Sequence, residues 1–123
     1  MRKKILIIDD DPDVSDLLTA RLETFGYEIV SAQNGADGCT KVREVNPELI
    51  FLDVTFPGES GVEILKKLKS EMPTGVQKIP VIMLTSSEHL EKDCAAAGAA
   101  GYITKPFDLY QLKEILSKHV PAH

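Results

Sequence analysis

The chain has 123 residues, with 14 lysines and arginines against 19 aspartates and glutamates, and its formal net charge is −5 at pH 7. This length suits one globular domain with a single hydrophobic core and leaves no room for a second domain. The acidic balance argues against direct nucleic-acid binding, because a non-specific nucleic-acid surface needs a basic patch.

The N-terminal residues argue against export and membrane insertion. A basic start, residues 1–4, is followed by only four apolar residues before Asp9, too few for the apolar region of an export signal. The chain has no apolar run approaching the roughly 18 residues that a membrane span needs. We therefore expect a cytoplasmic protein.

Five short apolar runs alternate with segments of helical periodicity. The runs are residues 5–8, 28–30, 49–52, 81–84 and 102–104. Strands that alternate with helices in so short a chain predict a parallel sheet covered on both faces, because each right-handed crossover lays its helix against the sheet. The expected fold is α/β, a flavodoxin-like (βα)5 domain with a five-stranded parallel sheet in the order 2-1-3-4-5.

The first helix has the clearest pattern. Asp11 precedes Pro12, which is favoured at the first position of a helix, so Asp11 is predicted to cap this helix and Asp13 to lie in its first turn. Gly26 supplies a C-terminal stop. The apolar residues at helical spacing on one face are Val14, Leu17, Leu18, Leu22 and Phe25.

The later helices have shorter patterns. Residues 34–45 form a weaker helical segment, and residues 73–78 are predicted to form a loop. Ser60 and Glu63 have the spacing of a capping box at the start of a helix. Cys39 and Cys94 are predicted to be reduced, partly buried thiols inside helices. The apolar helix positions are Leu65, Leu68 and Met72, expected to be buried, and Leu109, Leu112 and Leu116 in the last helix.

Aspartates follow two strands of the predicted sheet. Asp9, Asp10 and Asp11 come directly after the first apolar run, and Asp53 ends the third. In open α/β sheets a ligand binds beyond the carboxyl ends of the strands, here between strands one and three. With Asp11 assigned to the helix cap, the other three carboxylates are expected to meet in one crevice. Such a group is tolerated when a pKa is raised or a divalent cation binds, and an all-oxygen ligand set favours Mg²⁺.

Two further polar residues are predicted at the same edge of the sheet. Thr85 ends the fourth apolar run and Lys105 follows the fifth. A carboxylate nucleophile, a metal, a hydroxyl and an ammonium group are the parts needed to move a phosphoryl group, because the cations offset its charge while the carboxylate attacks in line. Each residue alone has an ordinary structural explanation, so the inference depends on their falling at one edge.

The chain as a whole resembles the receiver domain of bacterial two-component response regulators, with the fold of the single-domain chemotaxis regulators. The motifs occur in the family's order and spacing. They are the acidic pair Asp9 and Asp10, the stretch LDVTFPGESG around Asp53, Thr85 followed by Ser86, and GYITKPF, which contains Lys105. The resemblance implies one receiver domain over residues 1–123, with no output domain.

The resemblance also implies a phosphorelay role and a metal site. Asp53 would be the phosphoacceptor, taking a phosphoryl group from a phosphohistidine of a sensor histidine kinase or a histidine phosphotransfer protein. Mg²⁺, with Mn²⁺ as an alternative ion, would be held directly by Asp10, Asp53 and the backbone carbonyl of Thr55. Asp9 would act on the metal largely through water.

The remaining residues would transmit the change. Lys105 would contact the phosphoryl oxygens, Thr85 would be drawn towards them, and Tyr102 would turn inward into the space that Thr85 vacates. The response is expected on strand four, helix four, strand five and helix five, a surface that would control a downstream protein target. The chain would be a regulator and not an enzyme, assisting only its own phosphorylation and dephosphorylation. A cis peptide bond between Lys105 and Pro106 is also implied.

Two features depart from the family pattern. The segment between Thr85 and Lys105 is slightly short and alanine-rich, so we expect helix four to be short or loosely held. Phe56 stands where an aliphatic residue is usual, and it is expected either to form an apolar docking patch or to pack against a neighbouring loop. Thr55 and Ser87 are expected to tune the lifetime of the acyl phosphate.

Three other functions are considered. A small Mg²⁺-dependent phosphatase with an aspartyl-phosphate intermediate would need a general acid two residues after its nucleophile, where this chain has Thr55. A flavin carrier of the same fold would need hydroxyls and amides after strand one, where the aspartates would repel phosphate. A receiver-like module that binds partners without phosphorylation ranks low, since no residue required for phosphorylation is missing. The chain would be either a stand-alone regulator or a domain of a longer protein.

Overall fold

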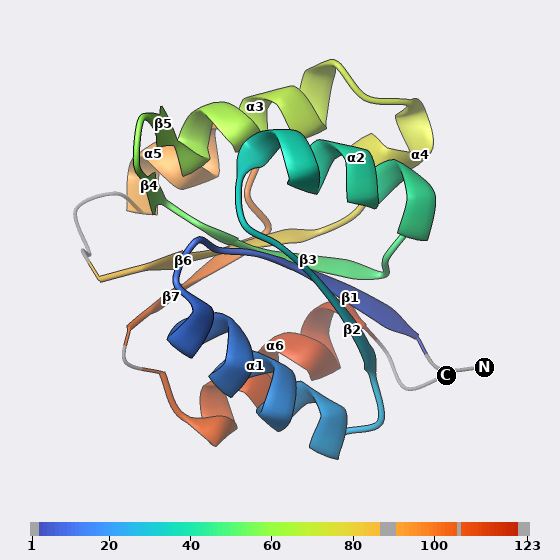
Figure 1. Ribbon diagram of the computed structural model, residues 1–123, viewed down its shortest axis with the longest axis vertical. Helices are drawn as coiled ribbons and strands as arrows, with labels where there is room; N and C mark the ends of the chain where they lie inside the picture. The colour runs from blue at the N-terminus through green and yellow to red at the C-terminus, as the bar shows by residue number, and fades with distance from the viewer. Residues whose placement is uncertain (1–2, 87–90, 106, 121–123) are drawn as a thin grey trace.

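The computed structural model describes residues 3–86, 91–105 and 107–120. Its main feature is a parallel sheet between two layers of helices (Figure 1). The strands lie in the order β2-β1-β3-β6-β7, and each neighbouring pair is parallel. They are β1 (Lys4–Ile8), β2 (Glu28–Ala32), β3 (Leu49–Asp53), β6 (Val81–Thr85) and β7 (Gly101–Thr104). The predicted α/β class with a five-stranded parallel sheet is confirmed.

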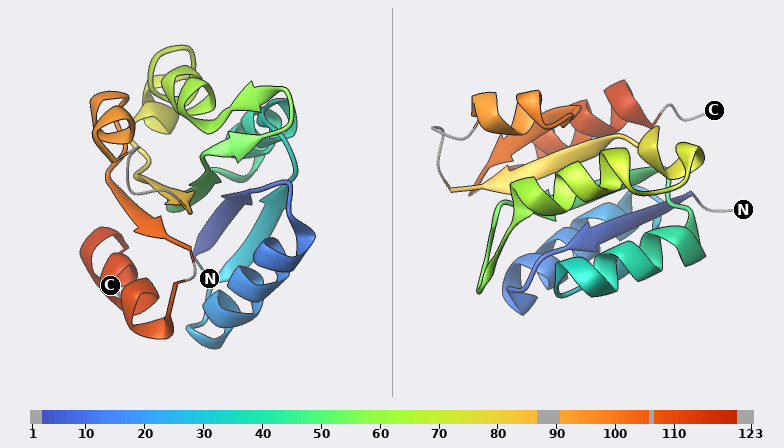
Figure 2. Two further views of the ribbon diagram at one scale, coloured as in Figure 1. Left: turned by 90° about the vertical axis from the view of Figure 1, so that its left-hand side faces the viewer. Right: turned by 90° about the horizontal axis from the view of Figure 1, so that it is seen from above.

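Helices cover both faces of the sheet, as Figures 1 and 2 show. Alternate residues of each strand point to opposite faces. Thus Ile5 and Ile7 pack in the core under one layer, whereas Leu6 and Ile8 pack under the other. Because both faces are covered, β1, β3 and β6 are buried at nearly every residue, which explains their continuous apolar runs in the sequence. One layer holds α1 (Pro12–Thr24) and α6 (Leu109–His119), and the other holds α2 (Gly35–Val45), α3 (Gly61–Ser70), α4 (Thr74–Gln77) and α5 (Glu91–Ala96).

The first helix begins and ends as predicted, but one of its apolar residues faces solvent. Asp11 Oδ1 accepts a hydrogen bond from the Asp13 amide at 2.9 Å, and Gly26 adopts a φ of +91° just after the helix. Leu18 and Leu22 are fully buried, whereas Leu17 is 47% exposed. The prediction that Leu17 shares the buried face was wrong, because a helix turns about 100° between consecutive residues and Leu18 takes the position nearest the sheet.

The last helix also has one apolar residue that faces solvent. Leu112 and Leu116 are buried against the sheet, but Leu109, the first residue of α6, is 41% exposed. A capping box closes the start of α6, since Asp108 accepts from the Gln111 amide and Gln111 Oε1 accepts from the Asp108 amide. In α3, Ser60 Oγ accepts from the Val62 amide at 3.2 Å, which confirms Ser60 as the cap.

The loop predicted at residues 73–78 was wrong, because the structure has a one-turn helix there, α4. Its Val76 side chain is buried in the core. Lys69 Nζ donates hydrogen bonds to the carbonyls of Gln77 at 3.0 Å and Ile79 at 2.7 Å. Contacts with α3 and the core therefore stabilise a turn that is too short to have a periodic pattern in the sequence.

A two-stranded antiparallel hairpin, formed by β4 (Thr55–Phe56) and β5 (Glu59–Ser60), was not predicted. It is inserted between β3 and α3, and it shifts the strand numbers of the parallel sheet. Gly58 has a φ of +74° in the turn between β4 and β5. Such a value favours glycine, so the Pro57–Gly58 pair suits this turn.

Strand β2 lies at one edge of the sheet. The Lys41 side chain, from α2, donates a hydrogen bond to the carbonyl of Ser31 on this strand. The same ammonium group lies 3.3 Å from Asp37, one turn earlier in the helix. A charged side chain therefore covers part of the free edge of β2.

Helix α5, the two cysteines and the lengths of the helices bear on the remaining predictions. Within the described part of the chain, α5 spans six residues, Glu91–Ala96, and residues 87–90 before it lie outside that part, so the short or loosely held helix expected there stays a prediction. Cys39 and Cys94 are free thiols, half-buried and buried respectively. The longest of the described helices has 13 residues, and none of them is long and apolar enough to cross a bilayer.

Candidate functional site

The carboxyl ends of the parallel strands bring the polar residues of the site to one edge of the sheet. The register pairs Ile8 with Leu52, so Asp9 and Asp53, the next residues in the two strands' paths, emerge side by side. Thr85 ends β6 opposite Thr104 of β7, which places Lys105 just beyond. This is the edge at which parallel α/β sheets bind ligands.

Three carboxylates form a cluster at this edge. Asp9, Asp10 and Asp53 each offer an oxygen, and these oxygens all lie within 4.8 Å of one another. Asp9 is 2% exposed and Asp53 is 7% exposed, whereas Asp10 faces solvent. Oxygen donors at this spacing, with one side open to water, fit a hard divalent cation such as Mg²⁺, which keeps some of its water ligands.

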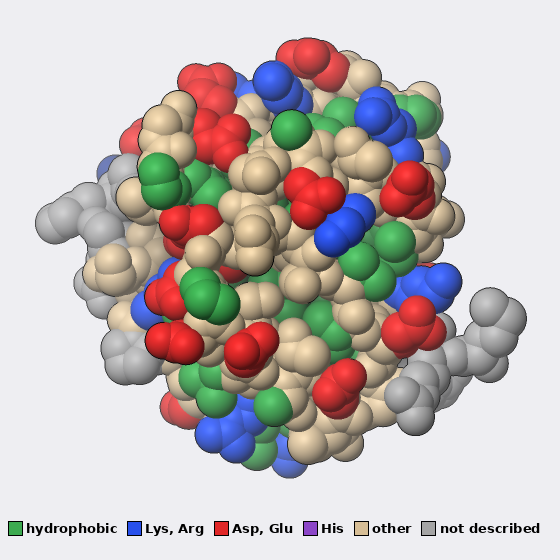
Figure 3. All heavy atoms as spheres, in the orientation of Figure 1, with side chains coloured by type: hydrophobic (Ala, Val, Ile, Leu, Met, Phe, Trp, Pro, Cys, Tyr) green, Lys and Arg blue, Asp and Glu red, His purple; other side chains and the backbone are tan. Residues whose placement is uncertain are grey.

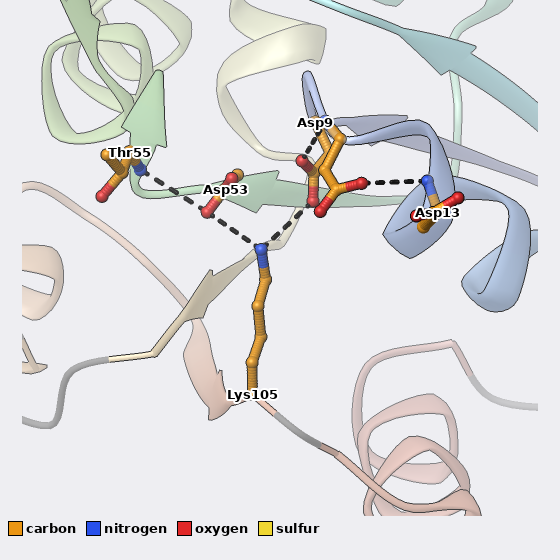
Figure 4. A network of polar contacts seen from close by, with 6 residues as sticks. Asp9, Asp13, Asp53, Thr55 and Lys105 are labelled. Carbon is orange, nitrogen blue, oxygen red and sulfur yellow. Dashed lines mark hydrogen bonds and ion pairs between the residues drawn. The ribbon is translucent and has the colours of Figure 1, made fainter. Parts of the chain in front are cut away.

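Lys105 is the cation of the site. Its Nζ lies 3.4 Å from Asp53 Oδ1 and 3.4 Å from Asp9 Oδ2 (Figure 4). The Lys105 amide donates to the Thr85 carbonyl at 2.7 Å, so the backbone of β7 stays paired with β6 up to this residue. One ammonium group therefore offsets two buried carboxylates from different strands.

Burial changes the acid strength of Asp53. The pKa of its carboxyl is raised from 3.8 to about 6, chiefly because burial disfavours the charged form and also because Asp9 lies close by. Lys105 and the Thr55 amide act in the opposite direction. A buried carboxylate whose pKa is raised beside a charged partner is typical of a functional site.

Asp9 and Asp11 have separate tasks at the start of α1. Asp9 Oδ1 accepts a hydrogen bond from the Asp11 amide at 2.9 Å, while Asp9 Oδ2 faces Lys105. The side chain of Asp11 caps α1 instead of joining the carboxylate cluster. The third residue of the aspartate run is thus structural, as the sequence predicted.

Thr55, Thr85 and Tyr102 differ in exposure: Thr55 is exposed, Thr85 is buried and Tyr102 is half-buried. The Thr55 amide is 3.5 Å from Asp53 Oδ1, at the long limit of a hydrogen bond. Thr85 is buried at the end of β6. Tyr102 lies within β7 opposite Met83, and its half-buried ring packs against the core under α2, α3 and α5.

Of the predictions about the loops around the site, one was wrong and others concern residues that the structure does not describe. Phe56 is 6% exposed and belongs to the core, so the apolar docking patch predicted for it was wrong, and packing against neighbours is what the structure shows. Ser87 and Pro106, and with them the predicted cis peptide bond, lie outside the described residues.

Gly61 shapes the loop after Asp53, and sequence reasoning gave it no role. Its amide donates to the Val54 carbonyl at 2.7 Å. A Cβ at this position would lie 2.0 Å from the Asp53 carbonyl oxygen, closer than any real side chain can approach. Only glycine lets α3 begin so close to the end of β3. The signal available in the sequence was a glycine directly after a capping serine, Ser60.

Acidic side chains also gather on the surface around this edge. In the space-filling view several of them lie on the left side of the molecule, near the start of α1 and the β4–β5 hairpin, and others are spread over the rest of this face (Figure 3). This agrees with the net charge of −5.

Comparisons with known proteins agree with this geometry. A family model described as response regulator receiver domain matches residues 5–117. The chain is 36% identical over 122 residues to Protein PilH of Pseudomonas aeruginosa, covering 97% of this chain and 95% of PilH. It is 37% identical over 111 residues to the DNA-binding dual master transcriptional regulator RpaA of Synechocystis, covering 89% of this chain but only 45% of RpaA, less than half of that protein's length.

A solved structure gives the same result for the fold. The response regulator TrrA of Thermotoga maritima, in complex with Mg²⁺–BeF, superposes with a TM-score of 0.85 at 33% identity, covering 96% of this chain and 99% of TrrA. The match extends over the sheet and the helices on both faces. Because the family model spans nearly all of the sequence and the relatives share its fold, the chain belongs to the response regulator receiver domain family.

Proposed function

We propose that this receiver domain is a phosphoacceptor in a two-component phosphorelay, and that Asp53 carries the phosphoryl group. The donor would be a phosphohistidine of a sensor histidine kinase or a histidine phosphotransfer protein in the cytoplasm. The observation that carries the proposal is the position of Lys105, 3.4 Å from both Asp53 and Asp9 beside the three-carboxylate cluster. That arrangement supplies a nucleophile, a cation and a metal site at one point.

The transfer follows from the positions of these groups. Asp53 is an acceptable nucleophile at neutral pH because its carboxyl, with a pKa of about 6, is mostly ionised there. A bond forms between an Asp53 carboxylate oxygen and phosphorus, and the bond between phosphorus and the donor imidazole nitrogen breaks. The electron pair of that bond returns to the imidazole nitrogen. Lys105 Nζ, already at the carboxylate, would offset the charge of the phosphoryl oxygens.

The carboxylate cluster supports a divalent cation at this site. Asp10 and Asp53, together with the backbone carbonyl of Thr55, would hold Mg²⁺ directly, and Asp9 would act largely through water; Mn²⁺ would serve as an alternative ion. When bound, the metal would neutralise charge that develops on the transferred phosphoryl group. The relative TrrA, solved with Mg²⁺–BeF, supports this choice of ion.

The response would leave the site through Thr85 and Tyr102. Thr85 would move towards the phosphoryl oxygens, and Tyr102 would turn into the space it leaves. Tyr102 is one of the residues that line a groove of about 260 Å³ beside Cys94 and Ala95 of α5. The affected surface consists of β6, α5, β7 and α6, and it would control a downstream protein target. The chain would assist only its own phosphorylation and dephosphorylation.

The test is intact mass after incubation with acetyl phosphate and Mg²⁺, with Asp53→Asn and a sample containing EDTA as controls. We expect one phosphoryl-sized increment that requires both Asp53 and the metal. No increment in the folded wild-type protein, beside a working positive control, would count against phosphorylation and favour a receiver-like module that binds partners without it.

A further inference from the structure

The β4–β5 hairpin carries Thr55 on one strand and Glu59 on the other. Thr55 pairs with Ser60, and Phe56 pairs with Glu59. The Thr55 amide is also the backbone group that approaches Asp53 Oδ1, at 3.5 Å. A change in the tilt of the hairpin therefore moves the Thr55 backbone relative to Asp53.

The base of the hairpin is attached to the end of β3. The Gly61 amide, directly after β5, donates to the Val54 carbonyl at 2.7 Å. The backbone of Gly61 also lies so close to the Asp53 carbonyl that no side chain fits between them. These contacts fix where the hairpin starts and ends.

Glu59, beside the turn of the hairpin, makes a contact with a different helix. Its Oε1 accepts a hydrogen bond from the Gly35 amide at 2.8 Å, and Figure 2 (left) shows the hairpin next to α2. Gly35 is the first residue of α2, and the helix cap, Asn34, accepts from the Asp37 amide. Glu59 thus satisfies another amide of the same turn, and its negative charge lies at the positive end of the helix.

Gly35 leaves the space that this contact needs. A Cβ on Gly35 would lie 2.9 Å from Glu59 Oε2 and 2.9 Å from Ile64 Cγ1. Both distances are shorter than real Cβ contacts, so a side chain here would displace the carboxylate or the isoleucine. The glycine at the start of α2 is therefore part of the same arrangement.

We propose that Glu59 is a positioning residue for the phosphorylation site. By binding the first turn of α2, it sets the tilt of the β4–β5 hairpin and holds the Thr55 backbone in place beside Asp53. The inference rests on the proposed function, because it takes from it that the site binds Mg²⁺ and a phosphoryl group. The hydrogen bond between Glu59 and Gly35 forms without a bound metal.

The experiment compares Glu59→Ala with Glu59→Gln and with a control, Glu63→Ala, by NMR of isotopically labelled protein. Glu63→Ala removes the same charge from the neighbouring first turn of α3. The Glu63 side chain is largely exposed, and its Oε1 lies 3.7 Å from Lys66 Nζ. In the metal-free protein, Glu59→Ala is expected to shift the Thr55 amide resonance and to speed hydrogen exchange at the Gly35 amide. Glu63→Ala should leave both unchanged.

Titration with Mg²⁺ is the second measurement. We expect Glu59→Ala to bind Mg²⁺ about two- to fivefold more weakly than wild type, the fold-change that corresponds to the free energy of the lost contact between the Glu59 carboxylate and the N-terminus of α2. Glu59→Gln keeps a side-chain oxygen that accepts the Gly35 amide, so it should restore part of the affinity and the wild-type Thr55 resonance.

Two results would overturn the proposal: a Thr55 resonance that does not move in Glu59→Ala, or an equal loss of Mg²⁺ affinity in Glu63→Ala. A wild-type protein that does not bind Mg²⁺ would count against the proposed function instead. In that case the metal-free measurements at Thr55 and Gly35 would still decide whether Glu59 positions the hairpin.

Discussion

Lys105 Nζ lies 3.4 Å from Asp53 Oδ1, although β6 separates the two strands that carry these residues. The lysine side chain reaches across the end of β6 to the end of β3. It therefore links β3, which holds the proposed phosphoacceptor, to the end of β7, the strand that holds Tyr102. Under the proposed function, a change in charge at Asp53 would act first on the Lys105 side chain, which follows β7.

Replacement of Lys105 by methionine tests this pairing. Because Lys105 lowers the pKa of Asp53, the pKa of that carboxyl should rise above about 6 in Lys105→Met. The rate of phosphorylation by acetyl phosphate should fall about 10- to 100-fold, as expected for loss of one charge-assisted contact. The measurements are an NMR titration of the Asp53 carboxyl and the rate of the mass increment. The matched control is Lys66→Met, an exposed lysine of α3, and an equal effect in that variant would contradict the prediction.

The raised pKa of Asp53 has a consequence for stability. The folded chain holds the Asp53 proton more tightly than the unfolded chain does, so this group favours folding at low pH, and its contribution is lost as pH rises from about 4 through about 6. In metal-free buffer at about pH 7.5, Asp53→Asn should be more stable than wild type by about 1–2 kcal/mol. Near pH 4 the difference should disappear.

Thermal unfolding of both proteins across this pH range measures the effect. Asp16→Asn serves as the control, since Asp16 is exposed on α1 and its replacement removes the same charge. If Asp53→Asn were no more stable than Asp16→Asn at neutral pH, burial of the Asp53 charge would not be costly.

Removal of one proposed metal ligand gives a third prediction. Asp10 is exposed, so Asp10→Asn should change the metal-free stability by no more than about 0.5 kcal/mol. The same variant should bind Mg²⁺ at least about tenfold more weakly, because it loses a charged oxygen ligand. Calorimetric titration and the Mg²⁺-induced rise in melting temperature measure this. Asp13→Asn, three residues further along and also exposed, should bind Mg²⁺ like wild type; a loss there would point to general charge attraction instead of ligation.

Two glycines offer a matched pair for the loop after Asp53. Gly61→Ala would place a Cβ 2.0 Å from the Asp53 carbonyl oxygen, so the start of α3 must shift. We expect a loss of about 2–4 kcal/mol in unfolding free energy and slower phosphorylation of Asp53. Gly75→Ala, in α4, meets no atom within 4 Å and should be neutral or slightly stabilising. Chemical denaturation and the mass assay would detect both effects. If Gly61→Ala behaved like wild type, the close approach of the Gly61 backbone to the Asp53 carbonyl would not be required.

The parts of the fold that the sequence predicted are those with strong local signals. Short apolar runs identified all five sheet strands, and Asp11 before Pro12 identified the start of α1. The carboxylate cluster could be expected because parallel strands end at one edge, which brings residues as distant as Asp9 and Asp53 together. The order of strands in the parallel sheet thus places residues that are distant in the sequence close together in space.

The features that the sequence did not reveal depend on tertiary contacts. Helix α4 has one turn, and buried Val76 together with the Lys69 hydrogen bonds stabilises it. The contact between Glu59 and Gly35 joins β5 to the start of α2, and the distance between them depends on the packing of α2 against α3. Leu17 was misplaced because a face defined by spacing alone is wider than the strip that touches the sheet.

The edge of the sheet at β2 bears on how the protein behaves at high concentration. An uncovered strand edge offers unpaired backbone groups to another chain and promotes aggregation or strand exchange. Here Lys41 uses the Ser31 carbonyl and brings an ammonium charge to that edge. A second strand would have to displace this charge and break its hydrogen bond before it could pair. Lys41 thus disfavours edge-to-edge pairing of β2 with a strand of a neighbouring molecule.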